Sequence, residues 1–485
     1  MADIAMHGHG VRGMHRDTLH SFNGIGDPGK FGIMFPGLVP LYVEDDKLFE
    51  LAEAMKDVPG LGGDNAKIPA GYTYLGQFVD HDITLDTTPL SQQKADPKAT
   101  QNFRTPALDL DSLYGDGPGI HPYLYQRDPA NRLRVTAKLL VGHTEASPDG
   151  PPPGGQNVPA GRHDLPRNQV GHALIGDERN DENLLVAQTH LLMIKFHNKV
   201  VDMLIAKGVT EDKLFAEARR IVTWHYQWIV LFDFVEKLTE PGLIRKIKHE
   251  GRKFYRFRDT PYMPAEFAAA AYRLGHSMVR GGYDHNRVFT PGSPFGGASM
   301  ALLFHFTGKS GFISGELAGS VVGAPAPGAF ETLPSNWVID WRRFYDLTRV
   351  GIAGQTAQSS KKLDPYIVSA LHTLPGFNPS MPANVQREFS LPFRNLRRGV
   401  QIGLPSGQAI CRAMQINPLT PAQIATGPDG AVAQRHGMDV ETPLWYYVLK
   451  EAEVLGNGER LGPMASTIVA ETFLGMVHGD KESFL

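Results

Sequence analysis

The sequence around position 80 reads Gly76-Gln77-Phe78-Val79-Asp80-His81-Asp82, and Tyr72-Thr73-Tyr74 precede it. If the segment is helical, Gln77, Asp80 and His81 share one face, whereas Asp82 points roughly 100° away from His81. The tripeptide Asp80-His81-Asp82 can therefore serve two different sites. Taken alone, the segment is also consistent with a surface cluster of acids around an incidental histidine.

A second segment carries oxygen-bearing groups at alternating positions. The side chains of Thr105, Asp109 and Asp111 and the carbonyl of Ala107 follow one another in a loop. Calcium prefers about six to eight oxygen ligands, and Asp82 would bring the number of carboxylates to three. The pattern predicts a calcium site, and a polar turn whose acids face water is the alternative.

Two further segments each place an arginine close to a second polar residue, a glutamate in one and a histidine in the other. Arg179 and Glu182 are three residues apart and are neighbours on a helix start, where a local ion pair is the common explanation. His276 lies in an apolar segment behind Arg273, and such a histidine is usually a hydrogen-bonded core residue. As an iron ligand it would need a partner for its other ring nitrogen, and Asn395 offers one.

Apolar residues at intervals of three and four predict long helices over residues 181–206 and 211–238. An alanine-rich segment that ends at Gly281-Gly282 predicts a third helix over residues 264–280. Alternating strand patterns are few, and Gly (52) and Pro (36) gather in stretches such as 142–167 and 322–335. These patterns predict a mainly α fold with long irregular loops and few short strands. Because the motifs run from Gln77 to Asn395, we expect one catalytic domain over residues 43–485 behind an N-terminal extension, residues 1–42.

The composition narrows the function classes. Among 485 residues, 42% are hydrophobic and the net charge is only -3, without a long block of Lys or Arg, which argues against nucleic-acid binding. No stretch approaches about eighteen uncharged apolar residues, and the N-terminus lacks the apolar core of a signal peptide. Cys411 is the only cysteine, so no internal disulfide forms. We expect a cytoplasmic enzyme without a membrane span, and leaderless export remains open.

Taken in order, these motifs resemble the peroxidase-cyclooxygenase superfamily, in particular the animal-type haem peroxidases and their compact bacterial members. The resemblance covers roughly residues 70 to 410. It includes Gly403-Leu404-Pro405, eight residues after Asn395. The animal haem peroxidase-like helical fold is thus implied by resemblance.

The resemblance also implies roles for individual residues. His81 and Arg179 would be catalytic, with Gln77 anchoring water or a small anion, and His276 would bind the iron of haem b with Asn395 as its partner. Arg273 and Arg398 would hold the haem propionates, and Asp80 and Glu182 would form ester bonds to haem methyl groups. Calcium would be bound by Asp82, Thr105, Ala107, Asp109 and Asp111.

The implied reaction is reduction of hydrogen peroxide through a ferryl intermediate, with oxidation of phenols, halides or thiocyanate and a role in the response to oxidative stress. Asn183 replaces the methionine that forms a third covalent link in one family member, so halides easier to oxidise than chloride are expected. The sequence does not specify the physiological donor or the oligomeric state.

Two rival functions remain open from the sequence. In fatty-acid dioxygenases of the same superfamily, a radical tyrosine lies three residues before the proximal histidine, where this chain has Arg273. Tyr272 is one residue out of register, and regular helical geometry would turn it away from the haem. The other rival is a non-enzymatic haem or calcium-binding protein.

Overall fold

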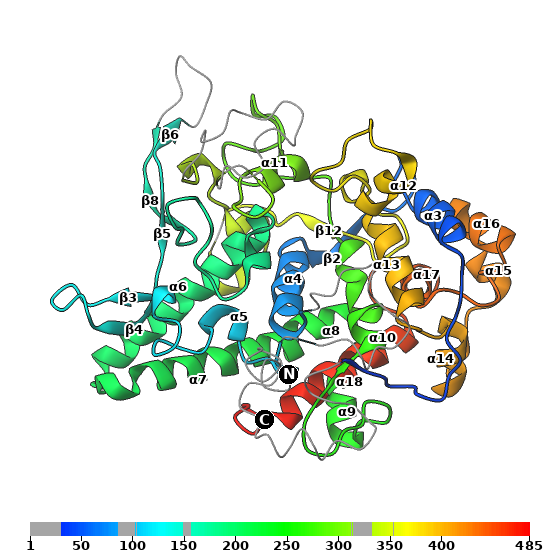
Figure 1. Cartoon of the computed structure of the whole chain (residues 1–485), viewed down its shortest axis with the longest axis horizontal. Coiled ribbons are helices and arrows are strands. Elements are labelled where there is room, and N and C mark those ends of the chain that lie inside the picture. Colours follow the sequence, from blue (N-terminus) through cyan, green and yellow to red (C-terminus); the bar gives the residue numbers. More distant parts are fainter. Residues whose placement is uncertain are drawn as a thin grey trace.

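The computed structural model describes residues 31–85, 102, 104–148, 157–311, 313, 332–352 and 354–485. This part of the chain is mainly helical, with long irregular loops and short strands (Figure 1), and the predicted fold class is confirmed. Residues 1–30, which include His7, His9 and His15, lie outside the described residues, as does most of the stretch 322–335.

The longer elements are joined by short 3-10 turns. The α-helices are α3 (Asp45–Ala54), α4 (Gly71–Ile83), α5 (Asp111–Tyr114), α6 (Leu184–Ala206), α7 (Glu211–Ile229), α8 (Val235–Leu238), α9 (Leu243–Glu250), α10 (Ala265–Ala268), α11 (Met300–His305), α12 (Ala383–Gln386), α13 (Leu391–Gln401), α14 (Gly407–Ala413), α15 (Pro421–Ile424), α16 (Gly427–Arg435), α17 (Leu444–Gly456) and α18 (Pro463–Gly479).

The strands form two-stranded pairs only, among the described residues. The one parallel pair is β1 (Phe31–Gly32) with β9 (Met263–Pro264). The antiparallel pairs are β2 (Asp64–Pro69) with β12 (Ser359–Lys361), β3 (Tyr125–Arg127) with β4 (Val135–Leu139), β5 (Gly142–Thr144) with β8 (Gly161–Asp164), β6 (Ser147–Pro148) with β7 (Asn157–Val158), and β10 (Gly282–Tyr283) with β11 (Ala298–Ser299).

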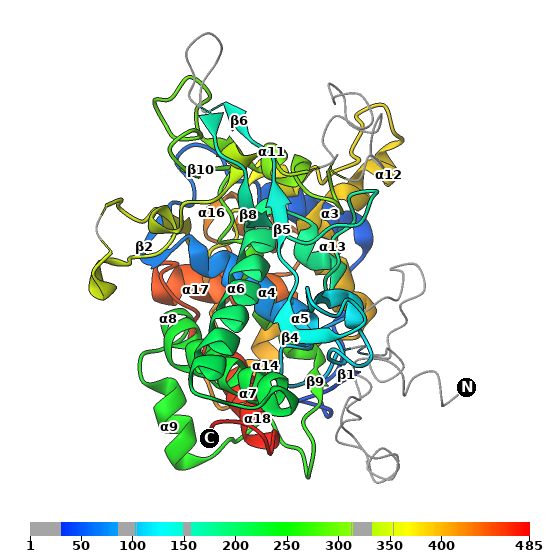
Figure 2. The same ribbon diagram turned by 90° about the vertical axis from the view of Figure 1, so that its left-hand side faces the viewer.

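Helix α4 lies at the centre of the molecule, as Figures 1 and 2 both show. It packs against α6 and against the 3-10 segment Ala271–His276, which in turn contacts α17 and α18. The C-terminal helix α18 is buried along nearly its whole length. The core thus surrounds α4, and α18 packs on the 3-10 segment that contacts it.

The two long helices predicted from periodicity are present, with local irregularities. Helix α6 begins at Leu184 rather than at residue 181, because Asn183 caps it by accepting a hydrogen bond from Val186 N at 3.0 Å. The predicted helix 211–238 is continuous, but its segment Val230–Phe234 is a π-helical turn between α7 and α8. Single π turns inside helices often mark functional sites.

The predicted helix over residues 264–280 is wrong as a continuous helix. Ala270, with φ -136° and ψ -73°, interrupts it, and α10 and the 3-10 segment Ala271–His276 replace it. Packing against α17 and α18 overrides the helix propensity of the alanines. Tyr272, expected to turn away from the haem site, lines the same cavity as His276. The two residues are four apart, a spacing that also shares one face of a regular α-helix.

The described end of the expected N-terminal extension, residues 31–42, is packed on the rest of the chain. Met34 and Phe35 are buried, and their backbone N–H groups donate to the buried carboxylate of Glu266 at 3.0 Å. The domain boundary at residue 42 stays a prediction. Among the described residues, no helix combines the length and apolar character that crossing a lipid bilayer requires.

Candidate active site

A cavity of about 590 Å³ lies between α4, the segment around Arg179, the 3-10 segment Ala271–His276 and α13. This volume falls within the range of roughly 300–1,000 Å³ that is usual for ligand and cofactor pockets. Gln77, Asp80 and His81 all line the cavity, whereas Asp82 does not. The shared face predicted for α4 is therefore confirmed.

His276 faces this cavity with one ring nitrogen held from behind. The amide nitrogen Nδ2 of Asn395 lies 2.8 Å from Nδ1 of His276, so Nδ1 is engaged and Nε2 is the ring nitrogen left for the cavity. The amide can turn over so that its oxygen takes the place of Nδ2. Burial, with the nearby cations Arg273 and Arg394, lowers the pKa of His276 to about 3, so the ring is neutral. When the amide presents its oxygen, Nδ1 donates and the lone pair of Nε2 is free, the form that an iron ligand requires.

His81 lines the same cavity from α4 and is oriented by an asparagine that the sequence analysis did not single out. Nδ1 of His81 donates to Oδ1 of Asn180 at 2.9 Å, and Nδ2 of Asn180 donates to Nδ1 of His190 at 3.0 Å. Burial lowers the pKa of His190 to about 3, so this ring is a neutral acceptor. His190 thereby fixes the amide of Asn180, and Asn180 fixes the tautomer of His81.

The tautomer so fixed leaves Nε2 of His81 as a lone-pair nitrogen beside the cavity. Burial, together with the positive charge of Arg179, lowers the pKa of His81 below its usual value near 6.5. A neutral imidazole can accept a proton, as a general base must. Nearby acids, first among them Glu182, raise the pKa of His81, but burial and Arg179 lower it by more.

Arg179 is held rigidly beside the cavity. Its Nε and Nη2 donate to Asp177, and Nη2 also donates to the backbone oxygens of His81 and Thr84 at 3.0 and 2.6 Å. Burial raises the pKa of Asp177, but Arg179 and Arg104 outweigh it and hold the pKa far below its usual range. Among the described residues Nη1 of Arg179 has no partner, so it can donate to a ligand in the cavity.

Gln77 is more constrained than the sequence analysis expected. Its amide nitrogen donates to Glu182, and its amide oxygen accepts from Nδ2 of Asn183 at 3.0 Å. Glu182 and Asp80 line the cavity on the same side. One amide hydrogen of Gln77 remains for water or an anion, which stays its predicted role.

Three arginines line the cavity near His276. Two of them, Arg273 and Arg398, were predicted, and the third, Arg394, was not. Burial and the neighbouring Arg398 lower the pKa of Arg394 from its usual value. Among the described residues, no acid forms an ion pair with the guanidinium of Arg394. Such a cluster of cations fits a ligand with carboxylate groups, as haem has.

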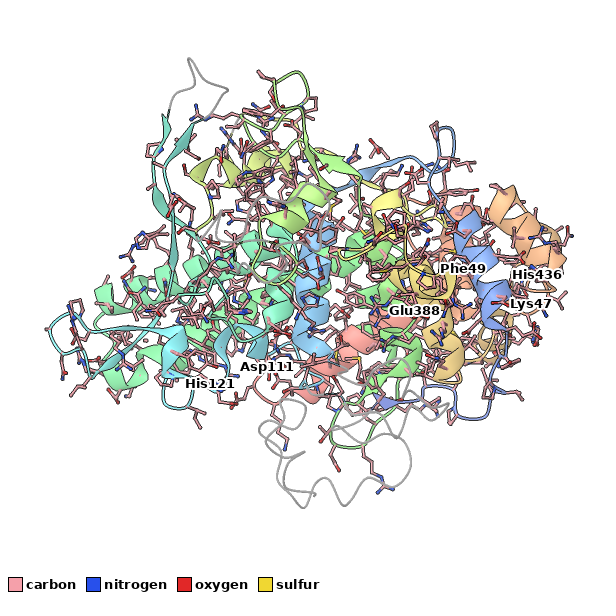
Figure 3. All side chains as sticks on the ribbon, turned by 45° about the horizontal axis from the view of Figure 1, so that its top comes forward. Lys47, Phe49, Asp111, His121, Glu388 and His436 are labelled. Atoms are coloured by element: carbon pink, nitrogen blue, oxygen red, sulfur yellow. The ribbon has the colours of Figure 1, made fainter. Side chains whose placement is uncertain are left out.

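The predicted calcium residues Asp82, Asp109 and Asp111 do come together. One carboxylate oxygen from each lies within 4.8 Å of the others, and Figure 3 labels Asp111, the first residue of α5. Asp82 accepts from Ser112 Oγ at 2.9 Å and from Leu110 N at 3.2 Å. Burial and the charge of Asp109 raise the pKa of Asp82 to about 7, which a bound cation would reverse.

A buried arginine, missed from the sequence, connects this acid cluster to the cavity. Nη1 of Arg104 donates to Asp111 at 2.9 Å, and its Nε donates to Asp177 at 3.1 Å. Asp177 also holds Arg179. One arginine shared between two acids cannot neutralise the whole cluster, so the donor set suits a divalent cation.

Comparisons with known proteins find peroxidases among the proteins similar to this chain. Thyroid peroxidase of Mus musculus is 29% identical over 196 residues, which cover 38% of this chain and 20% of that protein. A peroxidase-like protein of Margaritifera margaritifera is 24% identical over 420 residues, or 82% of this chain and 46% of that protein. The chain therefore spans about a fifth of the thyroid peroxidases that it matches.

Solved structures share the fold at low sequence identity. Peroxidase A of Dictyostelium discoideum superposes with a TM-score of 0.58 at 15% identity over 95% of this chain and 91% of that one. A fatty acid alpha-dioxygenase of Arabidopsis thaliana gives 0.60 at 16% identity over 98% and 78%. Residues 67–317 match the family model for the animal haem peroxidase domain, and the chain belongs to the animal haem peroxidase family.

Proposed function

We propose that this chain is a haem peroxidase that reduces hydrogen peroxide and oxidises small donors such as phenols, halides or thiocyanate. The observation that carries this proposal is that one cavity is lined by the pair His81 and Arg179 and also by His276, which Asn395 contacts. A protein that only bound haem would need neither a neutral buried base nor a free guanidinium nitrogen beside the cavity.

The residues around the cavity fit haem b. His276 would hold the iron through Nε2, and Arg273, Arg398 and Arg394 would pair with the propionates. When bound, haem supplies the redox chemistry, while the protein supplies position and electrostatics. His276 and the three arginines all line the same cavity, so one bound haem could contact all four residues.

The distal residues have complementary tasks in peroxide cleavage. Nε2 of His81 takes the proton from the inner oxygen of the peroxide and returns it to the outer oxygen, which leaves as water. Nη1 of Arg179 orients the peroxide and stabilises the negative charge that develops on the leaving oxygen. Asn180 acts through His81 and is a positioning residue.

Replacing the distal base tests the function directly. For His81→Ala we expect the reaction with one equivalent of peroxide, followed at the Soret band by stopped flow, to slow about 10²- to 10⁴-fold. In the parent, the rate should be constant where His81 is neutral and fall as pH drops through its lowered pKa. The exposed His225 provides the control variant His225→Ala.

An unchanged rate in His81→Ala would contradict the peroxidase proposal.

The second candidate, a fatty-acid dioxygenase, is favoured by one observation: Tyr272 lines the cavity, and its phenol donates to Gly76 O at 3.1 Å. Oxygen uptake with linoleate and no peroxide would support that candidate instead. Loss of uptake in Tyr272→Phe would then identify the tyrosine.

The role of Asn180 predicts a shift in pH dependence. Removing one hydrogen bond in Asn180→Ala costs about 0.5–1.5 kcal/mol, or about 2- to 12-fold in the peroxide rate. In Asn180→Asp, a carboxylate beside His81 stabilises the imidazolium, so the acid limb of the pH–rate profile should move to higher pH. If both variants keep the parent's profile, Asn180 has only a structural role.

We further propose that Asp80 and Glu182 form ester bonds to haem, which their place in the cavity wall supports. After turnover with peroxide, acid acetone should leave haem attached to the parent. The double variant Asp80→Ala/Glu182→Ala should release all of it. Complete extraction from the peroxide-treated parent would rule out covalent attachment.

We also propose that the acid cluster binds calcium, with Asp82, Asp109 and Asp111 as carboxylate ligands and Thr105 and Ala107 as further oxygen donors. Removing calcium with EGTA should lower the thermal midpoint and slow the peroxide reaction, because the cluster is tied to Arg179 through Arg104 and Asp177. At a calcium concentration about 100 times Kd, binding contributes about 2.7 kcal/mol to stability.

The calcium prediction has a matched pair of variants. Asp109→Asn should abolish the response of the thermal midpoint to EGTA, whereas Asp202→Asn, which removes an exposed acid of α6, should retain it. A parent protein whose midpoint and activity ignore EGTA would refute calcium binding at this cluster.

A further inference from the structure

A hydrogen-bonded tyrosine and carboxylate lie at the edge of the cavity, outside the groups assigned above. Tyr72, at the start of α4, lines the cavity, and its phenol donates to Oδ2 of Asp233 at 2.6 Å. The ammonium of Lys237 holds the other oxygen, Oδ1, at 2.5 Å. Asp233 has a side chain that is 35% exposed, so this carboxylate joins the cavity wall to solvent.

The π-helical turn Val230–Phe234 places this carboxylate. The turn carries Asp233 towards Tyr72, and it carries Phe234 into the cavity wall against Gly76. A Cβ on Gly76 would lie 2.8 Å from the ring of Phe234, so only glycine allows this approach. The π turn thus places two adjacent residues at the cavity, and such turns occur frequently at functional sites.

Aromatic rings continue from Tyr72 towards the surface. The ring of Tyr345 lies 5.3 Å from that of Tyr72, centroid to centroid, and the ring of Trp341 lies 5.8 Å from that of Tyr345. Both outer rings are only partly buried. Gly71 makes the first step close, because a Cβ there would lie 2.4 Å from the ring of Tyr345.

We propose that Tyr72 is a redox-active residue, with Asp233 as its proton acceptor, and that it serves a second donor site on the surface at Trp341 and Tyr345. This site would take aromatic one-electron donors too bulky to enter the cavity. The inference rests on the proposed function, since the oxidant is the haem cofactor after its reaction with hydrogen peroxide.

The step balances in electrons and protons. One electron passes from Tyr72 to the oxidised cofactor, and the proton on its phenol oxygen moves to Oδ2 of Asp233, which leaves a neutral tyrosyl radical. A donor at the surface then supplies one electron through Trp341 and Tyr345, and the proton returns from Asp233 to the phenol. The donor leaves oxidised by one electron and gives any proton of its own to solvent.

Neighbouring tyrosines of the cavity lack such an acceptor. The phenol of Tyr74 donates to the hydroxyl of Tyr283 at 2.8 Å, and that of Tyr272 donates to a backbone oxygen. Neither a phenol nor a backbone carbonyl accepts a proton readily, whereas a carboxylate does. Burial and the bond to Asp233 raise the pKa of Tyr72, so the phenol is protonated before oxidation and must lose that proton with the electron.

The test uses haem-loaded protein treated with one equivalent of peroxide and freeze-quenched for electron paramagnetic resonance. We expect a tyrosyl radical in the parent and in the control Tyr74→Phe, and at least a fivefold smaller signal in Tyr72→Phe and Asp233→Asn. A nitroso spin trap, mapped by mass spectrometry, should label Tyr72, Tyr345 or Trp341. Tyr72→Phe and Trp341→Phe should lower kcat/KM about tenfold for the bulky dye ABTS and leave iodide oxidation unchanged.

The possible failures can be told apart. If the Soret band responds to peroxide but the radical and the dye oxidation survive in Tyr72→Phe, the relay is wrong while the peroxidase proposal stands. The same conclusion follows if the trap labels only other residues. If the Soret band of the parent does not respond to peroxide at all, the proposed function fails and the relay fails with it.

Discussion

The rotation of about 100° per residue in α4 is the constraint on which the site depends. It turns His81 into the cavity and the next residue, Asp82, into the acid cluster on the other side of the helix. A cation bound at Asp82 would therefore act on the same helical turn that carries the distal base. Any change in the winding of α4 would move both sites at once.

The cavity and the acid cluster are also connected outside α4, by buried ion pairs. Burying an unpaired ion is costly, and two of the buried charges, Arg104 and Asp177, are each shared between two partners. Arg104 lies between Asp111 and Asp177, and Asp177 lies between Arg104 and Arg179. The result is a continuous chain of ion pairs from the acid cluster to the guanidinium that faces the cavity. These ion pairs hold Arg179 in a fixed position before any substrate arrives.

Local sequence patterns predicted the parts of the site that depend on one element. The shared face of Gln77, Asp80 and His81 follows from helical periodicity and is confirmed, as are the long helices around α6 and α7. The pairing of Asn395 with His276, expected from the family resemblance, is present as a hydrogen bond. The catalytic roles of these residues, and the ligand roles of Thr105 and Ala107, stay predictions.

The residues that were missed act through long-range contacts that no periodicity encodes. Asn180 reaches His81 from 99 positions away, and Arg104 reaches Asp177 from 73. The continuous helix predicted over residues 264–280 was wrong, because packing against α17 and α18 overrode the propensity of its alanines.

Both major irregularities of the helices lie at the cavity. The 3-10 segment Ala271–His276 brings Tyr272, Arg273 and His276 to one wall, and the π turn Val230–Phe234 brings Phe234 to another while directing Asp233 at Tyr72. The π turn is wound more widely than an α-helix, which changes the face that each of its residues occupies. Two adjacent residues, Asp233 and Phe234, thereby contact Tyr72 and line the cavity. The irregular turn is therefore part of how a mainly helical chain builds the cavity wall.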